Sequence, residues 1–268
     1  MRNSKSPHSY PVVSCLMITM GRVRHCERAI HCYERQTYPN TELIVVDDSG
    51  KDLSRLLSSV PNVLYVQLSP TSSYVLGELR NIALEVARGK YLAQWDDDDW
   101  YHPERLRTQI AILEQGYDAC CLQSTLMHVN TSEMVNKPYI GTLPKGIPGT
   151  IVHRCDDQIR YPSLSKGEDT EYLNKWCEKK YKIIPDRYRH LFIRCYHGDN
   201  TWSKDHFTRR LRNSISSSLE YFWCKFLMQD IYRHSRFDLS NEDQQSISLF
   251  KRDSVELGLL ARSSLSCT

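Results

Sequence analysis

Residues 91–106, YLAQWDDDDWYHPERL, place four consecutive aspartates between an apolar segment and a helix-like pattern. Adjacent carboxylates repel one another and raise each other's pKa unless a cation or a set of donors holds them ionised. The apolar residues 90–95 have the pattern of a buried strand, so the charge stands where that strand ends. The stretch therefore predicts an acidic cluster at a strand end, with a counter-charge beside it.

Strand and helix patterns alternate around this stretch. Apolar runs predict strands at 12–19, 41–50, 62–68 and 90–95, and apolar residues at helical spacing predict helices at 23–36, 51–60, 77–89 and 102–115. Such alternation predicts an α/β fold with a mainly parallel sheet flanked by helices. Ligands of these sheets bind beyond the carboxyl ends of the strands. We therefore expect Asp47 and Asp48, which end the second strand, to converge with the four aspartates.

The rest of the chain predicts three parts. Residues 1–10 are polar and are expected to be a loose tail, residues 11–204 the main domain, and residues 205–268 a C-terminal helical extension. Within the main domain, 117–129 and 141–154 predict further strands, and a helix is expected to begin at Glu168. The extension has apolar residues at helical spacing within 214–234, which we expect to pack against the main domain. A peripheral membrane contact or a homo-oligomer contact is the alternative.

Composition excludes some classes of protein. The net charge of +3 comes from 35 basic and 32 acidic residues, so no dense basic face for nucleic acid is expected. The ten cysteines are scattered without a C-x-x-C pair, which favours reduced thiols in a cytoplasmic protein. The early apolar run at 12–20 is shorter than the ~20 residues that span a bilayer, and no small-residue cleavage site follows it.

The counter-charge has two candidate explanations. A hard divalent cation, Mn²⁺ or Mg²⁺, prefers oxygen ligands and is commonly held by one or two carboxylates together with substrate phosphates. Alternatively, the acidic run is a solvated loop or the start of the helix at 102–115, where acidic residues complement the helix dipole. Composition alone leaves both explanations open.

The order of these segments resembles glycosyltransferase family 2 with its GT-A, Rossmann-like fold. The segments are VSCLMITMGRVRHCERAIHCYERQTYPNTELIVVDDSG at 13–50, LGELRNIALEVARGKYLAQWDDDDW at 76–100 and GEDTEYL at 167–173. The resemblance covers about 11–200. It implies a metal-dependent, inverting transfer of a sugar from a nucleotide sugar, most commonly a UDP-sugar. The acceptor would be a hydroxyl of a glycan, lipid-linked or other molecule, often in polysaccharide biosynthesis.

The resemblance also implies roles for individual residues. It assigns donor binding to Thr19, Arg22, Asp47, Asp48, Arg80, Asp96 and Asp97. Asp98, the last residue of the D-x-D triplet, is the first-choice ligand of Mn²⁺ or Mg²⁺, and the expected set is completed by Asp96, Asp99 and His197. Asp169 is the expected catalytic base, half-buried and with a raised pKa, and Glu168 is the second choice. Strand one ends in ITMGRVRH, which departs from the frequent Pro-Thr-Tyr-Asn-Arg ending.

Each assignment has a structural alternative. Asp47 and Asp48 before Ser-Gly would also form an Asx turn, Arg80 would also pair with a neighbouring glutamate, and carboxylates at 168–169 would also complement a helix dipole. Two other classes of protein remain. A nucleotidyltransferase acting on sugar phosphates would more naturally carry a G-x-x-x-x-G-K loop, which is absent from the sequence. A non-catalytic carbohydrate-binding relative has no need of Asp98 and Asp169.

Overall fold

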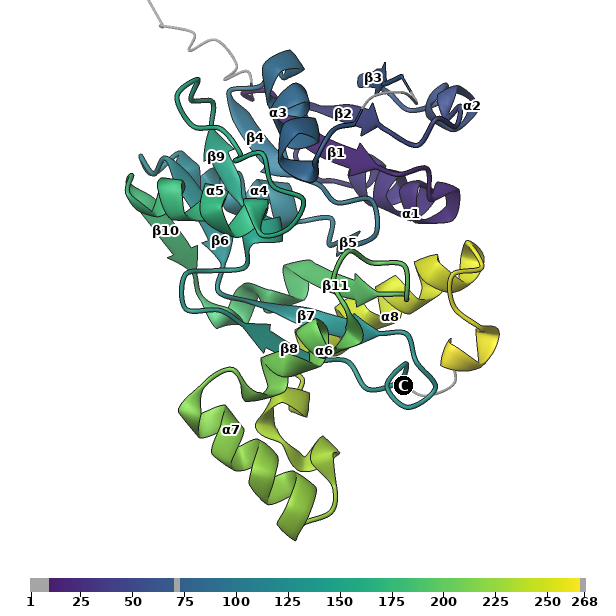
Figure 1. The fold of residues 1–268 in the computed structure, drawn as a ribbon, viewed down its shortest axis with the longest axis vertical. Coiled ribbons are helices and arrows are strands. Elements are labelled where there is room, and N and C mark those ends of the chain that lie inside the picture. Colours follow the sequence, from purple (N-terminus) through teal and green to yellow (C-terminus); the bar gives the residue numbers. More distant parts are fainter. Residues whose placement is uncertain (1–9, 70–72, 266–268) are drawn as a thin grey trace, which may run out of the picture.

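The computed structural model describes residues 10–69 and 73–265, and a seven-stranded sheet forms its upper half in Figure 1. Its strand order is β10-β6-β9-β4-β1-β2-β3, and neighbours are parallel except β9, which runs antiparallel to β4 and β6. The strands are β1 (Val13–Thr19), β2 (Thr41–Asp47), β3 (Val63–Gln67), β4 (Tyr91–Gln94), β6 (Ala119–Leu122), β9 (Val152–Arg154) and β10 (Tyr181–Ile184). The predicted mainly parallel α/β sheet is confirmed.

Alternation along β1 divides the core between the two faces of this sheet. Cys15 and Met17 point to a cluster that includes helices α1, α2 and α4, whereas Leu16 and Ile18 point to a cluster that includes α3 and α5. The helices are α1 (Val23–Glu34), α2 (Ser54–Leu57), α3 (Leu76–Val86), α4 (Arg105–Leu113) and α5 (Glu168–Cys177). Because both faces are covered, β1 is buried at every position.

The helix that was expected over 77–89 ends three residues early, and hydrogen bonds explain why. The backbone N–H of Arg88 donates to Glu42 Oε1 at 2.8 Å, and that of Gly89 donates to Ser14 Oγ at 2.8 Å. These partners on β1 and β2 draw the chain into the turn before β4. Both are contacts between residues distant in sequence, so the local pattern did not reveal them.

A second, four-stranded sheet lies below the first in Figure 1, in the order β5-β11-β7-β8. Its strands are β5 (Trp100–Tyr101), β7 (Ser124–Val129), β8 (Tyr139–Thr142) and β11 (Phe192–Tyr196). The four aspartates connect β4 of the first sheet to β5 of the second. They therefore stand where the chain passes between the two sheets.

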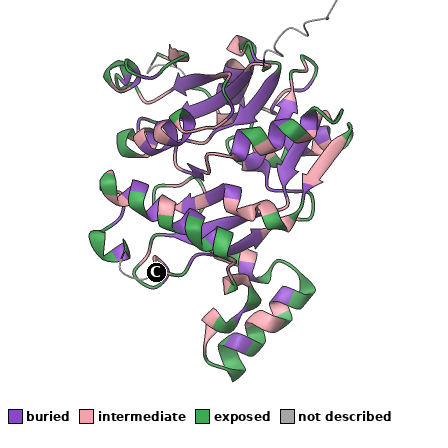
Figure 2. Ribbon diagram, turned by 180° about the vertical axis from the view of Figure 1, so that it is seen from behind, coloured by how far each residue is buried: buried purple, intermediate pink, exposed green. Residues whose placement is uncertain are grey.

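The helices after residue 204 differ in how closely they pack against the two sheets. Helix α8 (Asn241–Glu256) inserts Ile247 and Phe250 into the main core, as expected. After α6 (Lys204–Thr208), helix α7 (Ile215–Phe222) and the π-helical turn η4 (Trp223–Leu227) extend away from both sheets at the bottom of Figure 1. The expected packing is wrong for the apolar residues of this segment, because Leu219 and Phe226, for example, are 68% and 61% exposed. Figure 2 colours much of that helix green, for exposed, while the strands of both sheets are mainly purple.

Three other expectations concern the chain ends, the thiols and the membrane. Of the predicted N-terminal tail, residues 1–9 lie outside the described residues, and the domain division at residue 204 stays a prediction. The nine cysteines in the described part of the chain are all free. In that same part, no helix combines the length and the apolar character needed to cross a bilayer.

Candidate active site

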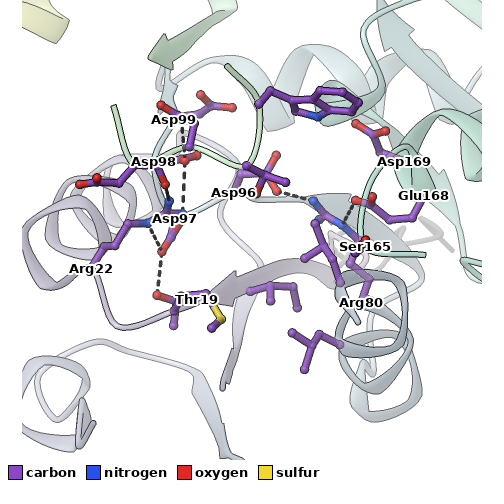
Figure 3. Close-up of a pocket in the computed structure, with 18 of the residues that line it drawn as sticks. Thr19, Arg22, Arg80, Asp96, Asp97, Asp98, Asp99, Ser165, Glu168 and Asp169 are labelled. Carbon is purple, nitrogen blue, oxygen red and sulfur yellow. Dashed lines mark hydrogen bonds and ion pairs between the residues drawn. The ribbon is translucent and has the colours of Figure 1, made fainter. Parts of the chain in front are cut away.

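A pocket of about 600 Å³ lies beyond the carboxyl ends of β1 and β4, at the junction of the two sheets (Figure 3). Ten of the twelve predicted site residues line it, and Asp47 and His197 do not. The ten are Thr19, Arg22, Asp48, Arg80, Asp96, Asp97, Asp98, Asp99, Glu168 and Asp169. The structure thus brings together side chains from the β1–α1 loop, α3, the aspartate run and α5.

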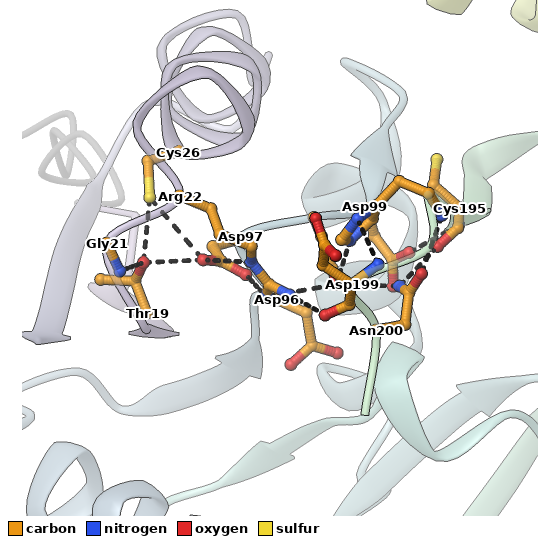
Figure 4. A network of polar contacts seen from close by, with 12 residues as sticks. Thr19, Gly21, Arg22, Cys26, Asp96, Asp97, Asp99, Cys195, Asp199 and Asn200 are labelled. Atoms are coloured by element: carbon orange, nitrogen blue, oxygen red, sulfur yellow. Dashed lines mark hydrogen bonds and ion pairs between the residues drawn. The ribbon is translucent and has the colours of Figure 1, made fainter. Parts of the chain in front are cut away.

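Asp97 and Asp99 are the two buried members of the aspartate run, and Figure 4 draws the contacts of Asp97 with Thr19 and Arg22. Only 1% of Asp97 is exposed, and its Oδ2 accepts a hydrogen bond from Thr19 Oγ1 at 2.7 Å. Arg22 forms an ion pair with its Oδ1 and donates from Nε to Oδ2 at 3.4 Å. Burial, together with the charge of Asp98, raises the pKa of Asp97 to about 6 although Arg22 opposes the change. Asp97 therefore holds the strand end in place.

Asp98 shares Arg22 with Asp97 and has further polar partners of its own. Its Oδ2 accepts from Asn200 Nδ2 at 3.1 Å and lies 3.2 Å from both Arg22 Nη2 and His197 Nε2. Burial alone would raise the pKa of Asp98, but the hydrogen bond with His197 and the charge of Arg22 outweigh it and hold the pKa well below its usual value. His197 is therefore a partner of Asp98 although it does not line the pocket.

Arg80 joins the aspartate run to helix α5. Its Nη2 donates to Asp96 Oδ1 at 2.9 Å and its Nε donates to Glu168 Oε1 at 3.1 Å. The guanidinium also lies 5.6 Å from the ring centroid of Tyr161. Two arginines thus supply the counter-charge that was expected from the sequence. Arg22 pairs with Asp97 and Asp98, and Arg80 pairs with Asp96.

Asp99 and Asp47 each accept a hydrogen bond from a backbone N–H group. Asp99 is 4% exposed and accepts from the N–H of Cys195 at 2.8 Å, and burial with the charges of Asp98 and Asp96 raises its pKa. Asp47 accepts from the N–H of Ser49 at 2.9 Å and from Tyr65 Oη at 2.8 Å, which is the Asx-turn alternative. Of the two aspartates after β2, only Asp48 lines the pocket.

Gly21 determines how closely the loop after β1 approaches the loop after β2. Its φ of +74° is a conformation that L side chains rarely adopt, and a Cβ there would lie 2.6 Å from Cβ of Ser49. The structure thus shows a close approach of this loop to Ser49, which follows Asp48 in the chain.

The two carboxylates at the start of α5 differ in their surroundings. Glu168 is 3% exposed and bound to Arg80, and burial raises its pKa although Arg80 opposes the change. Asp169 is half-buried, as expected, and accepts from the N–H of Thr170 at 2.6 Å. Figure 3 places both on the opposite side of the pocket from Asp97 and Asp98. Asp169 therefore lines the cavity, and among residues 10–69 and 73–265 no ion pair engages it as Arg80 engages Glu168.

Sequence reasoning missed some residues around the pocket. Arg194 on β11, Ser165 before α5 and Tyr74 before α3 line it, and His25 of α1 lies against His197 in a tilted arrangement with ring centroids 4.2 Å apart. Burial, followed by the charges of His197 and Arg28, lowers the pKa of His25 to about 3. These residues carry no local motif, and only the fold brings them to the aspartates. Asn200 and Trp202 also line the pocket, and the one usable signal was their nearness in sequence to His197, which the resemblance had singled out.

The ligand atoms that the side chains offer determine whether a divalent cation fits the pocket. Within 10–69 and 73–265, no group of three or more His, Cys, Asp and Glu side chains is arranged to hold a metal ion. A Mg²⁺-type site needs only one or two carboxylates when substrate phosphates supply the other ligands. Asp96 and Asp98 both line the pocket and His197 Nε2 lies 3.2 Å from Asp98 Oδ2, so these side chains offer such a set. The residues present fit a cation that binds together with a phosphate ligand.

Comparison with known proteins gives both sequence and structural matches. Residues 14–137 match the family model described as Glycosyl transferase family 2. WcaA of Escherichia coli (strain K12), whose name describes a glycosyl transferase of colanic acid biosynthesis, is 34% identical over 110 residues, which are 39% of this chain and 39% of the relative. The chain thus spans about two fifths of the length of that curated relative.

Two solved structures share the fold over most of the chain. S. aureus TarS 1–349 in complex with UDP-GlcNAc has a TM-score of 0.56 at 17% identity and covers 91% of this chain and 81% of its own. A mannosyltransferase from Pyrobaculum calidifontis, in complex with GDP-Man and Mn²⁺, has a TM-score of 0.54 at 15% identity, over 98% of this chain and 76% of its own. The matched model thus assigns residues 14–137 to glycosyltransferase family 2, and the chain as a whole shares the GT-A fold of these glycosyltransferase structures.

Proposed function

We propose that the protein is a metal-dependent, inverting glycosyltransferase that moves a sugar from a nucleoside diphosphate sugar to a hydroxyl group. A UDP-sugar is the favoured donor, and a glycan, lipid-linked or other molecule is the acceptor. The observation that carries the proposal is one pocket lined by Asp96, Asp98 and Asp169, with Asp98 and Asp169 on opposite sides of it. The relative named for colanic acid biosynthesis supports a role in polysaccharide assembly.

The donor would bind with its diphosphate beside the aspartate run. Asp98, with Asp96 or His197, would hold Mn²⁺ or Mg²⁺, which when bound neutralises charge on the departing diphosphate as a Lewis acid. Arg22 and Arg80 line the same pocket and add positive charge there. The complexes of the two structural neighbours with UDP-GlcNAc and with GDP-Man and Mn²⁺ support this class of donor.

Asp169 is the better candidate for the general base. A base must lie within hydrogen-bond reach of the acceptor hydroxyl and must be free to take its proton as the oxygen attacks the anomeric carbon. Glu168 is buried and bound to Arg80, whereas Asp169 lines the pocket and is half-buried. In this scheme Arg80 fixes Glu168 and thereby the start of α5, so that Asp169 faces the acceptor. A single displacement of this kind inverts the anomeric configuration.

The proposal is tested by incubating the protein with a panel of UDP-, GDP- and dTDP-sugars, with Mn²⁺ or with EDTA, and measuring the release of nucleoside diphosphate. We expect release from one class of donor, with Mn²⁺ present, that increases when a hydroxyl acceptor is added. A parallel assay supplies nucleoside triphosphates and sugar phosphates and measures pyrophosphate. Pyrophosphate release without any nucleoside diphosphate release would indicate a nucleotidyltransferase and contradict the proposal.

A further inference from the structure

Helix α7 and the turn η4 present a continuous apolar face to solvent. Six large apolar side chains of this segment are between 56% and 84% exposed, and they are Ile215, Leu219, Phe222, Trp223, Phe226 and Leu227. They recur at intervals of three and four residues and therefore share one side of the helix. We call this set the α7 face. Its aromatic members include a stacked pair, Phe222 and Phe226, with ring centroids 5.6 Å apart.

The opposite side of the same helix is anchored to the chain that follows it. Ser217 and Cys224 are buried, and His234 Nε2 lies 3.1 Å from the carbonyl oxygen of Ser217. Glu220 accepts from the N–H and the hydroxyl of Ser235 at 2.7 and 2.8 Å. The acidic side chain of the helix is thus turned away from the α7 face and engaged. These contacts hold the helix with its apolar side outward.

Basic side chains border the α7 face. A shallow groove of about 680 Å³ is lined by Arg209 and Arg212 together with Ile215, Leu219 and Phe222. Further along, the Lys225 ammonium lies 5.5 Å from the ring centroid of Phe226. Residues 204–237 carry seven Lys and Arg against three Asp and Glu. The lining of the groove therefore combines positive and apolar side chains.

We propose that the α7 face docks the protein on an anionic lipid bilayer. A helix with aromatic and aliphatic residues on one side and basic residues beside them lies in the plane of a bilayer, with the apolar side chains at the headgroup and acyl boundary. Arg209 and Arg212 would contact lipid phosphates, which the negative surface potential of anionic lipids favours. A second copy of the chain fits less well, because it would bring two basic segments together.

Docking at this face would hold the pocket near the bilayer. Helix α6 leads from the pocket, which Phe207 lines, to the basic turn at Arg209 and Arg212. Phe207 and Leu211 are buried against the second sheet, so this connection is packed into the body of the protein. The membrane proposal does not depend on the proposed function, because vesicle binding is measured without donor or acceptor.

The test is co-sedimentation of the full chain with vesicles of phosphatidylcholine, with and without phosphatidylglycerol. We expect binding to the anionic vesicles that weakens as salt is added, since salt screens charges over about 10 Å at 0.1 M. The double variant Phe222→Ser/Phe226→Ser should lose binding by at least about tenfold. The double variant Arg209→Gln/Arg212→Gln should lose about fivefold for each charge removed near the surface.

Matched controls separate the α7 face from general charge effects. Arg55→Gln/Arg252→Gln removes two exposed arginines outside this segment and should change binding by less than about twofold. Circular dichroism and an unchanged thermal midpoint would verify that each variant is folded. Failure of the folded wild-type chain to bind anionic vesicles would overturn the proposal. Equal binding to both kinds of vesicle would overturn it too, as would a dimer that Phe222→Ser/Phe226→Ser dissociates.

Discussion

Arg22 Nη2 lies 3.2 Å from Asp98 Oδ2, the carboxylate that we propose as the metal ligand, and the same guanidinium pairs with Asp97. In this structure Arg22 supplies the positive charge at the position where a divalent cation would act. The two cations therefore compete for Asp98 electrostatically. When two positive charges lie beside one carboxylate they repel each other, so each makes binding of the other less favourable.

Replacing Arg22 should therefore shift the balance toward the metal. In Arg22→Gln we expect a lower thermal midpoint without metal, because Asp97 and Asp98 lose their shared partner, and a larger upward shift on addition of Mn²⁺ than in the wild type. The comparison is a thermal-shift titration of both proteins with Mn²⁺. Arg55→Gln, on the exposed helix α2, serves as the control. A smaller Mn²⁺ shift in Arg22→Gln than in the wild type would refute the competition.

Asp169 and Glu168 should give different kinetic defects. Asp169→Asn removes the proposed base, so we expect kcat to fall by about 10²- to 10⁴-fold while donor affinity is kept. Glu168→Gln keeps the shape but weakens the ion pair with Arg80, so donor affinity and stability should change more than in Asp169→Asn. Steady-state transfer kinetics and donor binding by calorimetry measure both quantities. Unreduced kcat in Asp169→Asn would exclude it as the base.

Asp253 attaches α8 to the rest of the protein. It is 2% exposed, pairs with Arg35 and accepts from Trp100 Nε1 at 2.8 Å. We expect Asp253→Asn to lower the free energy of unfolding by about 2 kcal/mol, below the 3–5 kcal/mol typical of fully buried pairs, because Arg35 keeps part of its exposure to water. Urea unfolding measures the change. Glu256→Gln, exposed on the same helix, should stay within about 0.5 kcal/mol of the wild type.

Glu42 should make stability depend on pH. Burial would raise its pKa, but hydrogen bonds from Ser14 and Arg88 outweigh burial and lower it. A carboxyl whose folded pKa is lowered stabilises the fold above its unfolded pKa of about 4.3, and that stability is lost as the pH falls through the folded pKa. Glu42→Gln should therefore cost about 1–2 kcal/mol at neutral pH, and the difference from the wild type should shrink in acid. Urea unfolding across this pH range measures it, and a difference that grows in acid would contradict the assignment.

The sequence predicted those features that depend on local patterns. The strand before the aspartates and the start of α5 at Glu168 follow from local patterns and are confirmed. The convergence of Asp48 with Asp96 and Asp98 follows from the rule that parallel strands end at one edge of a sheet. None of these predictions required knowing which side chains, distant in sequence, contact one another.

The partners of the charged residues could not be predicted in the same way. Arg22 is hydrogen-bonded to Asp97, which is 75 residues away in sequence, and Arg80 to Glu168, which is 88 residues away. Asp47 and Asp48 look equivalent in sequence, yet Tyr65 and the turn at Ser49 engage Asp47. Likewise, helical periodicity shows that Phe222 and Phe226 share a side of a helix but not whether protein covers that side.

The most direct test of the account is isothermal titration calorimetry of UDP binding, with and without Mn²⁺, to the wild type and to Asp98→Asn. GDP and dTDP are run in parallel so that the choice of nucleotide does not decide the outcome. The account predicts that Mn²⁺ strengthens binding of one nucleoside diphosphate to the wild type by at least about tenfold and that Asp98→Asn removes this gain. Equal enhancement by Mn²⁺ in the wild type and in Asp98→Asn would contradict it.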